Sequence, residues 1–189
     1  MRRRRFLGRV GVAGAIGTAG CGSRGDEDRE GPSEAPVSRR FRIGDDGFEV
    51  AVGDGPFAPF GVRGVNLGMA KPGRFPGEAA ITRGEYDRWL AAMGELNVNV
   101  VRVYTVHPPA FYRALTAYNR SHATPIYLLH GNWIGEETLR EAGDATSVSA
   151  AFDRSFRQVV DAVHGATTIA PEPGYASGTY DADVSDAVL

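Results

Sequence analysis

The strongest constraint on this chain of 189 residues is an alternation of short apolar runs with amphipathic helical segments. Residues 98–104 and 125–130 are apolar at nearly every position, which is typical of strands covered on both faces of a parallel sheet. Apolar residues recur at helical spacing before, between and after these two runs. The sequence therefore predicts an α/β fold in which right-handed crossovers connect parallel strands.

Three segments carry the helical periodicity. The first begins at a capping box formed by Thr82 and Glu85, and the second opens with the prolines at 108–109. The third runs from about residue 149 to 164 and stops at Gly165. The residues expected on the buried faces of these helices are Tyr86, Trp89, Leu90, Met93, Leu96, Phe111, Ala114, Leu115, Tyr118, Phe152, Phe156, Val159, Val160 and Val163.

The remaining segments are read from their turn residues. Residues 41–52 predict a short β-hairpin with an Asp-Gly turn, and residues 60–67 predict a strand before the first helix. The Pro/Gly-rich segment 166–183 is predicted to be a loop, and residues 184–189 to begin a fourth element. A barrel and an open doubly wound sheet both fit this order of elements. The first strand–helix connection lacks a dinucleotide-binding fingerprint and a P-loop, which disfavours nucleotide binding.

The N-terminal segment differs in composition from the rest of the chain. Five arginines in the first nine positions precede a mildly apolar run over residues 10–20. A charged head followed by a short apolar run is typical of a secretory signal, and the run is too short to span a bilayer. Residues 3–7, Arg-Arg-Arg-Phe-Leu, resemble a twin-arginine export signal. We therefore expect residues 1–20 to be a signal peptide.

The one cysteine of the chain lies directly after this run. Residues 18–21, Thr-Ala-Gly-Cys, resemble a lipobox, which implies that Cys21 is lipidated and becomes the mature N-terminus. Residues 21–40 are then a flexible linker, since they contain too few apolar residues to form a core. These features imply an exported protein anchored by lipid to the outer face of the cytoplasmic membrane. The alternative is that Cys21 is an incidental residue of a cleaved peptide.

Charge and composition exclude several classes of function. The formal net charge is −2, and no basic patch with interleaved aromatic residues follows the N-terminal arginines, so we expect no nucleic-acid partner. A single cysteine excludes an intramolecular disulfide and a cysteine metal cluster. The histidines at 107, 130 and 164 are too scattered to define a metal site. We expect neither a metal nor a cofactor.

Polar and aromatic side chains gather where the predicted strands end. In parallel barrels these carboxyl ends carry the functional residues. Amide and guanidinium groups bind hydroxyls, and an indole offers a flat apolar face to a sugar ring. The sequence therefore predicts carbohydrate binding by Asn66, Arg102, Tyr104, His107, His130, Asn132 and Trp133.

A structural interpretation stands beside each of these assignments. Arg102 would form a structural ion pair, and His130 would be a hydrogen-bonded histidine of the core. His107 would be a loop and cap residue, and Trp133 would cover a sheet edge. Asn66 would brace the first loop, and Tyr104 would lie in the core.

Three segments resemble one group of enzymes. Residues 57–66, FAPFGVRGVN, resemble the entry to the first barrel strand of clan A glycoside hydrolases. Residues 97–102, NVNVVR, resemble the second-strand motif G-x-N-x-x-R of that clan, with Asn97 in place of the usual glycine. Residues 102–108 are similar to family 2 hydrolases and glucanosyltransferases. The resemblance covers about residues 41–189 and implies a partial (β/α)8 TIM barrel of about three strand–helix units preceded by a short β-hairpin.

The resemblance also implies roles for several residues and the lack of the catalytic glutamates. Arg102 would keep the catalytic nucleophile ionised, and Asn66, His130, Asn132 and Trp133 would line the sugar subsites. Clan A enzymes are retaining, and their two glutamates follow strands four and seven of the barrel. Since strand four would begin at the end of this chain, we expect the N-terminal part of a glycoside hydrolase that lacks both catalytic glutamates and is inactive as given. The chain would be a fragment, a truncated product or a part completed by another chain.

Two other classes of function stay open. The first is a non-catalytic glycan-binding lipoprotein of the cell surface, which would use the same residues at the strand ends. The second is an open doubly wound binding protein. Its sheet would reverse its strand order at a switch point, which a barrel does not do.

Overall fold

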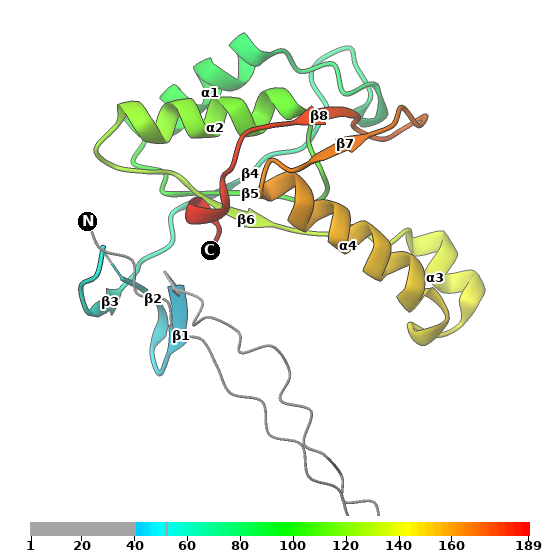
Figure 1. The fold of residues 1–189 in the computed structure, drawn as a ribbon, viewed down its shortest axis with the longest axis horizontal. Helices are drawn as coiled ribbons and strands as arrows, with labels where there is room; N and C mark the ends of the chain where they lie inside the picture. Colours follow the sequence, from blue (N-terminus) through cyan, green and yellow to red (C-terminus); the bar gives the residue numbers. More distant parts are fainter. Residues whose placement is uncertain (1–40, 52) are drawn as a thin grey trace, which may run out of the picture. The chain divides into compact units, whose positions relative to one another are not determined.

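A parallel sheet covered on one face by two helices lies at the centre of the protein (Figure 1). The computed structural model describes residues 41–51 and 53–189. The predicted signal peptide, the Cys21 lipidation site and the linker over residues 21–40 lie outside the described residues, so these expectations stay predictions.

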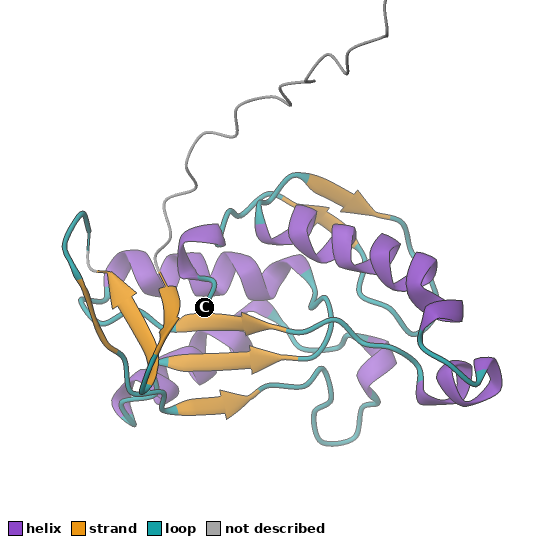
Figure 2. Ribbon diagram, turned by 90° about the horizontal axis from the view of Figure 1, so that it is seen from below, coloured by secondary structure: helices purple, strands orange, loops and turns teal. Residues whose placement is uncertain are grey.

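The central sheet follows the alternation that the sequence predicts. Its strands are β4 (Gly64–Asn66), β5 (Val100–Val103) and β6 (Tyr127–His130), paired in parallel in that order. Helix α1 (Arg83–Glu95) connects β4 to β5, and α2 (Pro109–Ser121) connects β5 to β6. The two helices pack against each other over the same face of the sheet (Figures 1 and 2).

The core lies between this face and the two helices. Residues of the sheet and the helices, among them Val101, Leu128, Tyr86 and Leu115, are fully buried there. The predicted buried faces of α1 and α2 are confirmed except at one position. Leu96 is 76% exposed, because it ends the helix and the next residue turns the chain away in a left-handed conformation.

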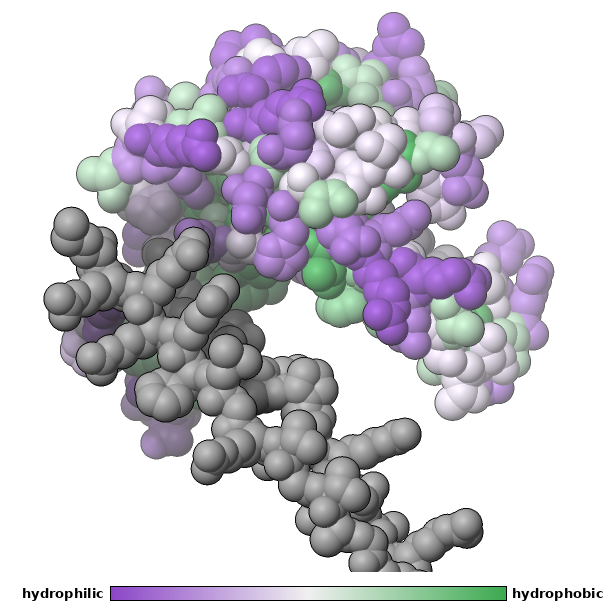
Figure 3. All heavy atoms as spheres, viewed as in Figure 1, coloured by the Kyte–Doolittle hydropathy of each residue, from purple (hydrophilic) through white to green (hydrophobic). Residues whose placement is uncertain are grey.

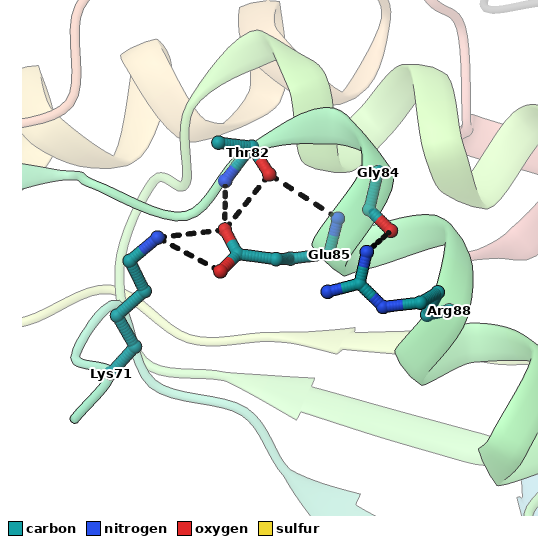
Figure 4. Close-up of polar contacts among 5 residues, drawn as sticks. All are labelled: Lys71, Thr82, Gly84, Glu85 and Arg88. Atoms are coloured by element: carbon teal, nitrogen blue, oxygen red, sulfur yellow. Dashed lines mark hydrogen bonds and ion pairs between the residues drawn. The ribbon is translucent and has the colours of Figure 1, made fainter.

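The capping box at the start of α1 is confirmed (Figure 4). The Thr82 backbone N–H donates to the Glu85 carboxylate over 2.7 Å, and the Glu85 N–H donates to the Thr82 hydroxyl over 3.4 Å. Lys71 donates to both carboxylate oxygens of Glu85 over 2.9 and 2.8 Å. These bonds, led by that from Lys71, lower the pKa of Glu85 to about 2. The loop after β4 is thereby tied to the first turn of α1.

The third strand–helix unit is less regular than the first two. Helix α4 (Ser149–Val163) forms close to its predicted bounds, but a further helix, α3 (Glu136–Ala142), precedes it and was not predicted. After α4 the chain returns to the sheet, where Val188 forms a parallel bridge with Leu128 of β6. The end of the chain therefore lies beside β6, on the side opposite β5.

Helix α4 covers the core with only part of its apolar stripe. Val159 and Val163 are buried, whereas Phe156 is 48% and Val160 is 41% exposed. The prediction that both are buried is wrong, because no described element packs over that side of the helix. Figure 3 shows exposed apolar residues next to α4, near the centre of the view.

The segment 166–183 is not the loop that its composition predicts. It contains an antiparallel hairpin of β7 (Thr167–Ile169) and β8 (Gly178–Tyr180). Tyr180 is 2% exposed, and its hydroxyl donates to the His107 carbonyl over 2.9 Å. Arg113 of α2 forms two hydrogen bonds with Asp181, of 2.6 and 2.8 Å, just after the hairpin. Strands of three residues among prolines and glycines carry too little periodicity to be recognised.

The predicted N-terminal hairpin is confirmed and gains a third strand. Strands β1 (Phe41–Gly44), β2 (Gly47–Ala51) and β3 (Phe57–Pro59) form an antiparallel sheet in that order. Phe41 and Tyr127 pack edge to face with ring centroids 4.7 Å apart. Figure 2 shows this sheet at the amino ends of the parallel strands.

The described residues thus form a mixed α/β fold with parallel strands in sequential order, and they do not close into a barrel. None of the described helices has the length and apolar character that a membrane span requires.

Candidate functional site

Two of the predicted site residues lie side by side at the carboxyl edge of the sheet. Asn66 of β4 is paired in register with Arg102 of β5, and Arg102 is paired with Leu129 of β6. Successive residues of a strand point to opposite faces, and Val101 and Val103 point toward the helices. Asn66 and Arg102 therefore lie on the face that no helix covers, and both are exposed.

The face of the sheet that no helix covers is buried at one end and exposed at the other. At the amino ends of the strands it is covered by the antiparallel sheet, where Phe60 packs on Tyr127 with ring centroids 5.5 Å apart. At the carboxyl ends the exposed pair Asn66 and Arg102 is reached from solvent. We call this exposed part, with Asn66, Arg102 and Tyr104, the open edge.

The guanidinium of Arg102 lies over an aromatic ring. Its central carbon is 4.4 Å from the centroid of Tyr104, a distance typical of a cation–π contact. Within residues 41–51 and 53–189, no carboxylate lies at ion-pair distance from Arg102. The stacking holds the plane of the guanidinium and leaves its N–H groups for a bound acceptor.

His130 does not join Asn66 and Arg102 on the open edge. It is paired in register with Val103 and points to the helix-covered face, where the Tyr112 hydroxyl donates to its Nε2 over 2.8 Å. Its Nδ1 lies 2.8 Å from the Gly131 carbonyl, which only accepts, so the proton of the neutral ring is on Nδ1. Burial lowers the pKa of His130. The three strand ends share one rim of the sheet, but only two of the three side chains share a face.

His107 lies deeper still. It is 1% exposed, and its Nδ1 forms a hydrogen bond of 3.0 Å with the Tyr86 hydroxyl. Its backbone N–H donates to the Tyr112 hydroxyl over 3.4 Å. Burial, and secondarily the charge of His130, lowers the pKa of His107 to about 4. A side chain enclosed in this way does not touch a ligand in this conformation, so the predicted sugar contact by His107 is not available here.

Asn132 and Trp133 leave the sheet together. The Asn132 amide nitrogen donates to the Ser155 hydroxyl over 2.8 Å and to the Phe152 carbonyl over 3.3 Å, both in α4. Trp133 is 65% exposed. The tryptophan is therefore the one large aromatic surface that the predicted set presents freely to solvent.

The tyrosines that hold the two histidines are not among the predicted site residues. Tyr86, Tyr112 and Tyr180 are each at most 2% exposed. Burial raises the pKa of Tyr180 to about 12 and raises the pKa values of Tyr86 and Tyr112 further. Tyr86 was predicted to be buried, but nothing in the pattern indicated that its hydroxyl would meet a histidine far along the chain.

The open edge has the groups for binding rather than for bond cleavage. The residues that directly follow β4, β5 and β6 include no Asp or Glu, whereas retaining hydrolysis of a glycoside needs two carboxylates about 5–5.5 Å apart. The described residues also bring together no group of three His, Cys, Asp or Glu side chains that could hold a metal ion. The Asn66 amide and the Arg102 guanidinium of the open edge, together with the exposed Trp133 indole after β6, suit a neutral polyhydroxyl ligand.

Comparisons with protein-family models, with curated proteins and with solved structures gave no match. A functional assignment therefore depends on the residues and the geometry of this chain.

Proposed function

We propose that this chain is part of a (β/α)8 barrel of the glycoside hydrolase type and that its open edge binds carbohydrate. The sequential strand order supports the barrel. The strands β4, β5 and β6 are neighbours in chain order, and Val188 adds beside β6. A doubly wound sheet reverses its order at a switch point, and the described strands contain no such reversal, which speaks against that alternative.

The observation that carries the proposal is the register of Asn66 with Arg102 on the uncovered face. It gives adjacent strands two hydrogen-bonding side chains that face solvent at the edge where barrels bind their substrates. The stacking of Arg102 on Tyr104 and the exposure of Trp133 add a fixed guanidinium and an apolar surface. Sugar rings offer hydroxyls to the first and C–H faces to the second.

The activity proposed for the 189 residues is binding without hydrolysis. The motifs support the N-terminal part of a retaining enzyme that acts on O-glycosidic bonds, and β4, β5 and β6 correspond to the first three barrel strands, which do not carry the catalytic glutamates of that family. A glycan-binding lipoprotein is the second candidate, since the same side chains serve it. Purified chain should show no turnover of aryl β-glycosides, and measurable retaining hydrolysis would contradict this proposal.

We propose further that the protein is exported and anchored through Cys21. The arginine-rich start and the residues Thr-Ala-Gly-Cys at 18–21 support this. Anchoring by a single acyl chain is marginal, so stable attachment needs two or more chains. Cys21→Ala should release the protein from the membrane fraction into the medium, and unchanged membrane retention would contradict the lipid anchor.

The binding proposal is tested by calorimetry of the full chain with hexasaccharides of β-glucan, chitin, xylan and mannan. Arg102→Ala should weaken the best binder by about tenfold or more, because hydrogen bonds from a charged group contribute about 1.5–3 kcal/mol. Arg88→Ala is the matched control, since its guanidinium bonds only to the Gly84 carbonyl of its own helix over 3.1 Å (Figure 4). Equal affinities for both variants would contradict the proposed site.

A further inference from the structure

The short segment from His130 to Trp133 is held by three different elements. Its backbone is tied to β5, because the Gly131 N–H donates to the Val103 carbonyl over 2.8 Å. A Cβ on Gly131 would lie 3.0 Å from that carbonyl oxygen and 3.3 Å from the Tyr104 Cα, so the segment packs closely on β5. The Tyr112 hydroxyl of α2 holds the His130 ring.

The third attachment comes from α4 through a serine. The Ser155 hydroxyl donates to the Phe152 carbonyl over 2.9 Å, which turns its lone pairs toward the Asn132 amide at 2.8 Å. The same amide nitrogen also donates to the Phe152 carbonyl over 3.3 Å. Both hydrogens of the Asn132 amide are thereby used within the protein, so this nitrogen is not free to donate to a sugar.

Trp133 follows directly after these attachments. Its side chain is 65% exposed. Within residues 41–51 and 53–189 it has no aromatic or hydrogen-bonding partner, whereas Trp89 packs on Tyr86 with ring centroids 6.1 Å apart. The backbone before Trp133 is therefore fixed while its ring is left uncovered.

We infer that Ser155 is a positioning residue that acts through Asn132 to hold Trp133 ready for a sugar ring. This rests on the proposed function and adds to it a residue outside the predicted site. Asn132 then serves the binding site by orienting its neighbour, and its amide nitrogen does not donate to the ligand. An aromatic surface whose backbone is already ordered loses less conformational freedom on binding and therefore binds more tightly.

The inference is tested in the full chain labelled with 5-fluorotryptophan, whose two 19F resonances are assigned with Trp133→Phe. Ser155→Ala should narrow the Trp133 resonance, because the ring gains motion, and should leave the Trp89 resonance unchanged. Ser155→Thr keeps a hydroxyl and should restore the line width. Ser149→Ala is the matched control in the same helix, since its hydroxyl bonds only to the Thr146 carbonyl over 2.8 Å.

The same variants are then titrated with the best-binding hexasaccharide. Ser155→Ala should weaken binding about three- to tenfold, the loss expected when one hydrogen bond is removed, and Ser149→Ala should not. Asn132→Ala should give the same two changes, and it replaces Ser155→Ala if that variant fails to fold.

An unchanged Trp133 resonance in a folded Ser155→Ala variant would overturn the inference, whatever the affinity. A mobile Trp133 with unchanged affinity would overturn the link to sugar binding. If the wild-type chain binds none of the sugars, the proposed function fails, and the 19F spectrum still decides whether Ser155 positions Trp133.

Discussion

The two faces of the parallel sheet differ in what they do with polar side chains. On the helix-covered face, His107 is buried and His130 is half-buried, and both are hydrogen-bonded to tyrosines of α1 and α2. On the other face, Asn66 and Arg102 are exposed at the carboxyl edge. The first set of polar groups is hydrogen-bonded within the protein, and the second faces solvent. The comparison predicts that the first face determines stability and the second determines binding.

The largest effect is expected from truncation on the helix-covered face. Phe111 is fully buried beside His107, with ring centroids 5.0 Å apart. Phe111→Ala should lower the free energy of unfolding in urea by about 3–5 kcal/mol, because it leaves a cavity. Arg102→Ala should change it by less than about 0.5 kcal/mol. Similar costs for both variants would contradict the division between the faces.

The next effect is a loss of stability in mild acid. The folded pKa of His107 is lowered to about 4, whereas an unfolded histidine titrates near 6.5. The neutral ring therefore favours the folded state above pH 6.5, and this contribution is lost as the pH falls through 4. The free energy of unfolding should fall by up to about 3 kcal/mol across that range. In His107→Gln the fall should be smaller, with the lowered pKa of His130 still contributing, and an equal fall would show that other groups cause it.

A smaller effect is expected when the hydroxyl of Tyr112 is removed. Tyr112 donates to His130 Nε2 and accepts from the His107 N–H. Tyr112→Phe leaves both groups buried without this partner and should cost about 1–3 kcal/mol of unfolding free energy. The measurement is urea unfolding at pH 7, with Tyr175→Phe, at an exposed position, as the control. A neutral Tyr112→Phe would contradict the structural role of the hydroxyl.

The smallest effect concerns the end of α1. Leu96 is 76% exposed, so Leu96→Ser should change the free energy of unfolding by no more than about 0.5 kcal/mol. Leu90→Ser at the buried position of the same helix is the comparison. A large cost at Leu96 would mean that its side chain is buried after all.

Local signals of the sequence predicted the elements well. The capping box of Thr82 and Glu85 defines the start of α1 by its own chemistry, and the Asp-Gly turn defines the hairpin of β1 and β2. Helical spacing predicted the buried faces of α1 and α2. It failed at Leu96 and along α4, because spacing says which residues share a side and not what packs against it.

The sequence predicts at which edge of the sheet the candidate site residues lie, but not on which face of the sheet each side chain lies. A strand that is apolar throughout, such as residues 125–130, does not reveal which of its residues point to the helices. A shift of one residue reverses the side, so His130 and its neighbour Leu129 end on opposite faces of the sheet. The contact between Tyr112 and His130 depends on the packing of α2, which no local pattern encodes.

The most direct test of the account is a 1H–15N NMR titration of the full chain with the best-binding hexasaccharide. We expect the largest chemical-shift changes on the amides and side chains of Asn66, Arg102 and Trp133, while those of His107 and the α1–α2 layer change little. Changes confined to the helix-covered side, or no change with any of the four sugars, would contradict the claim that the open edge binds carbohydrate.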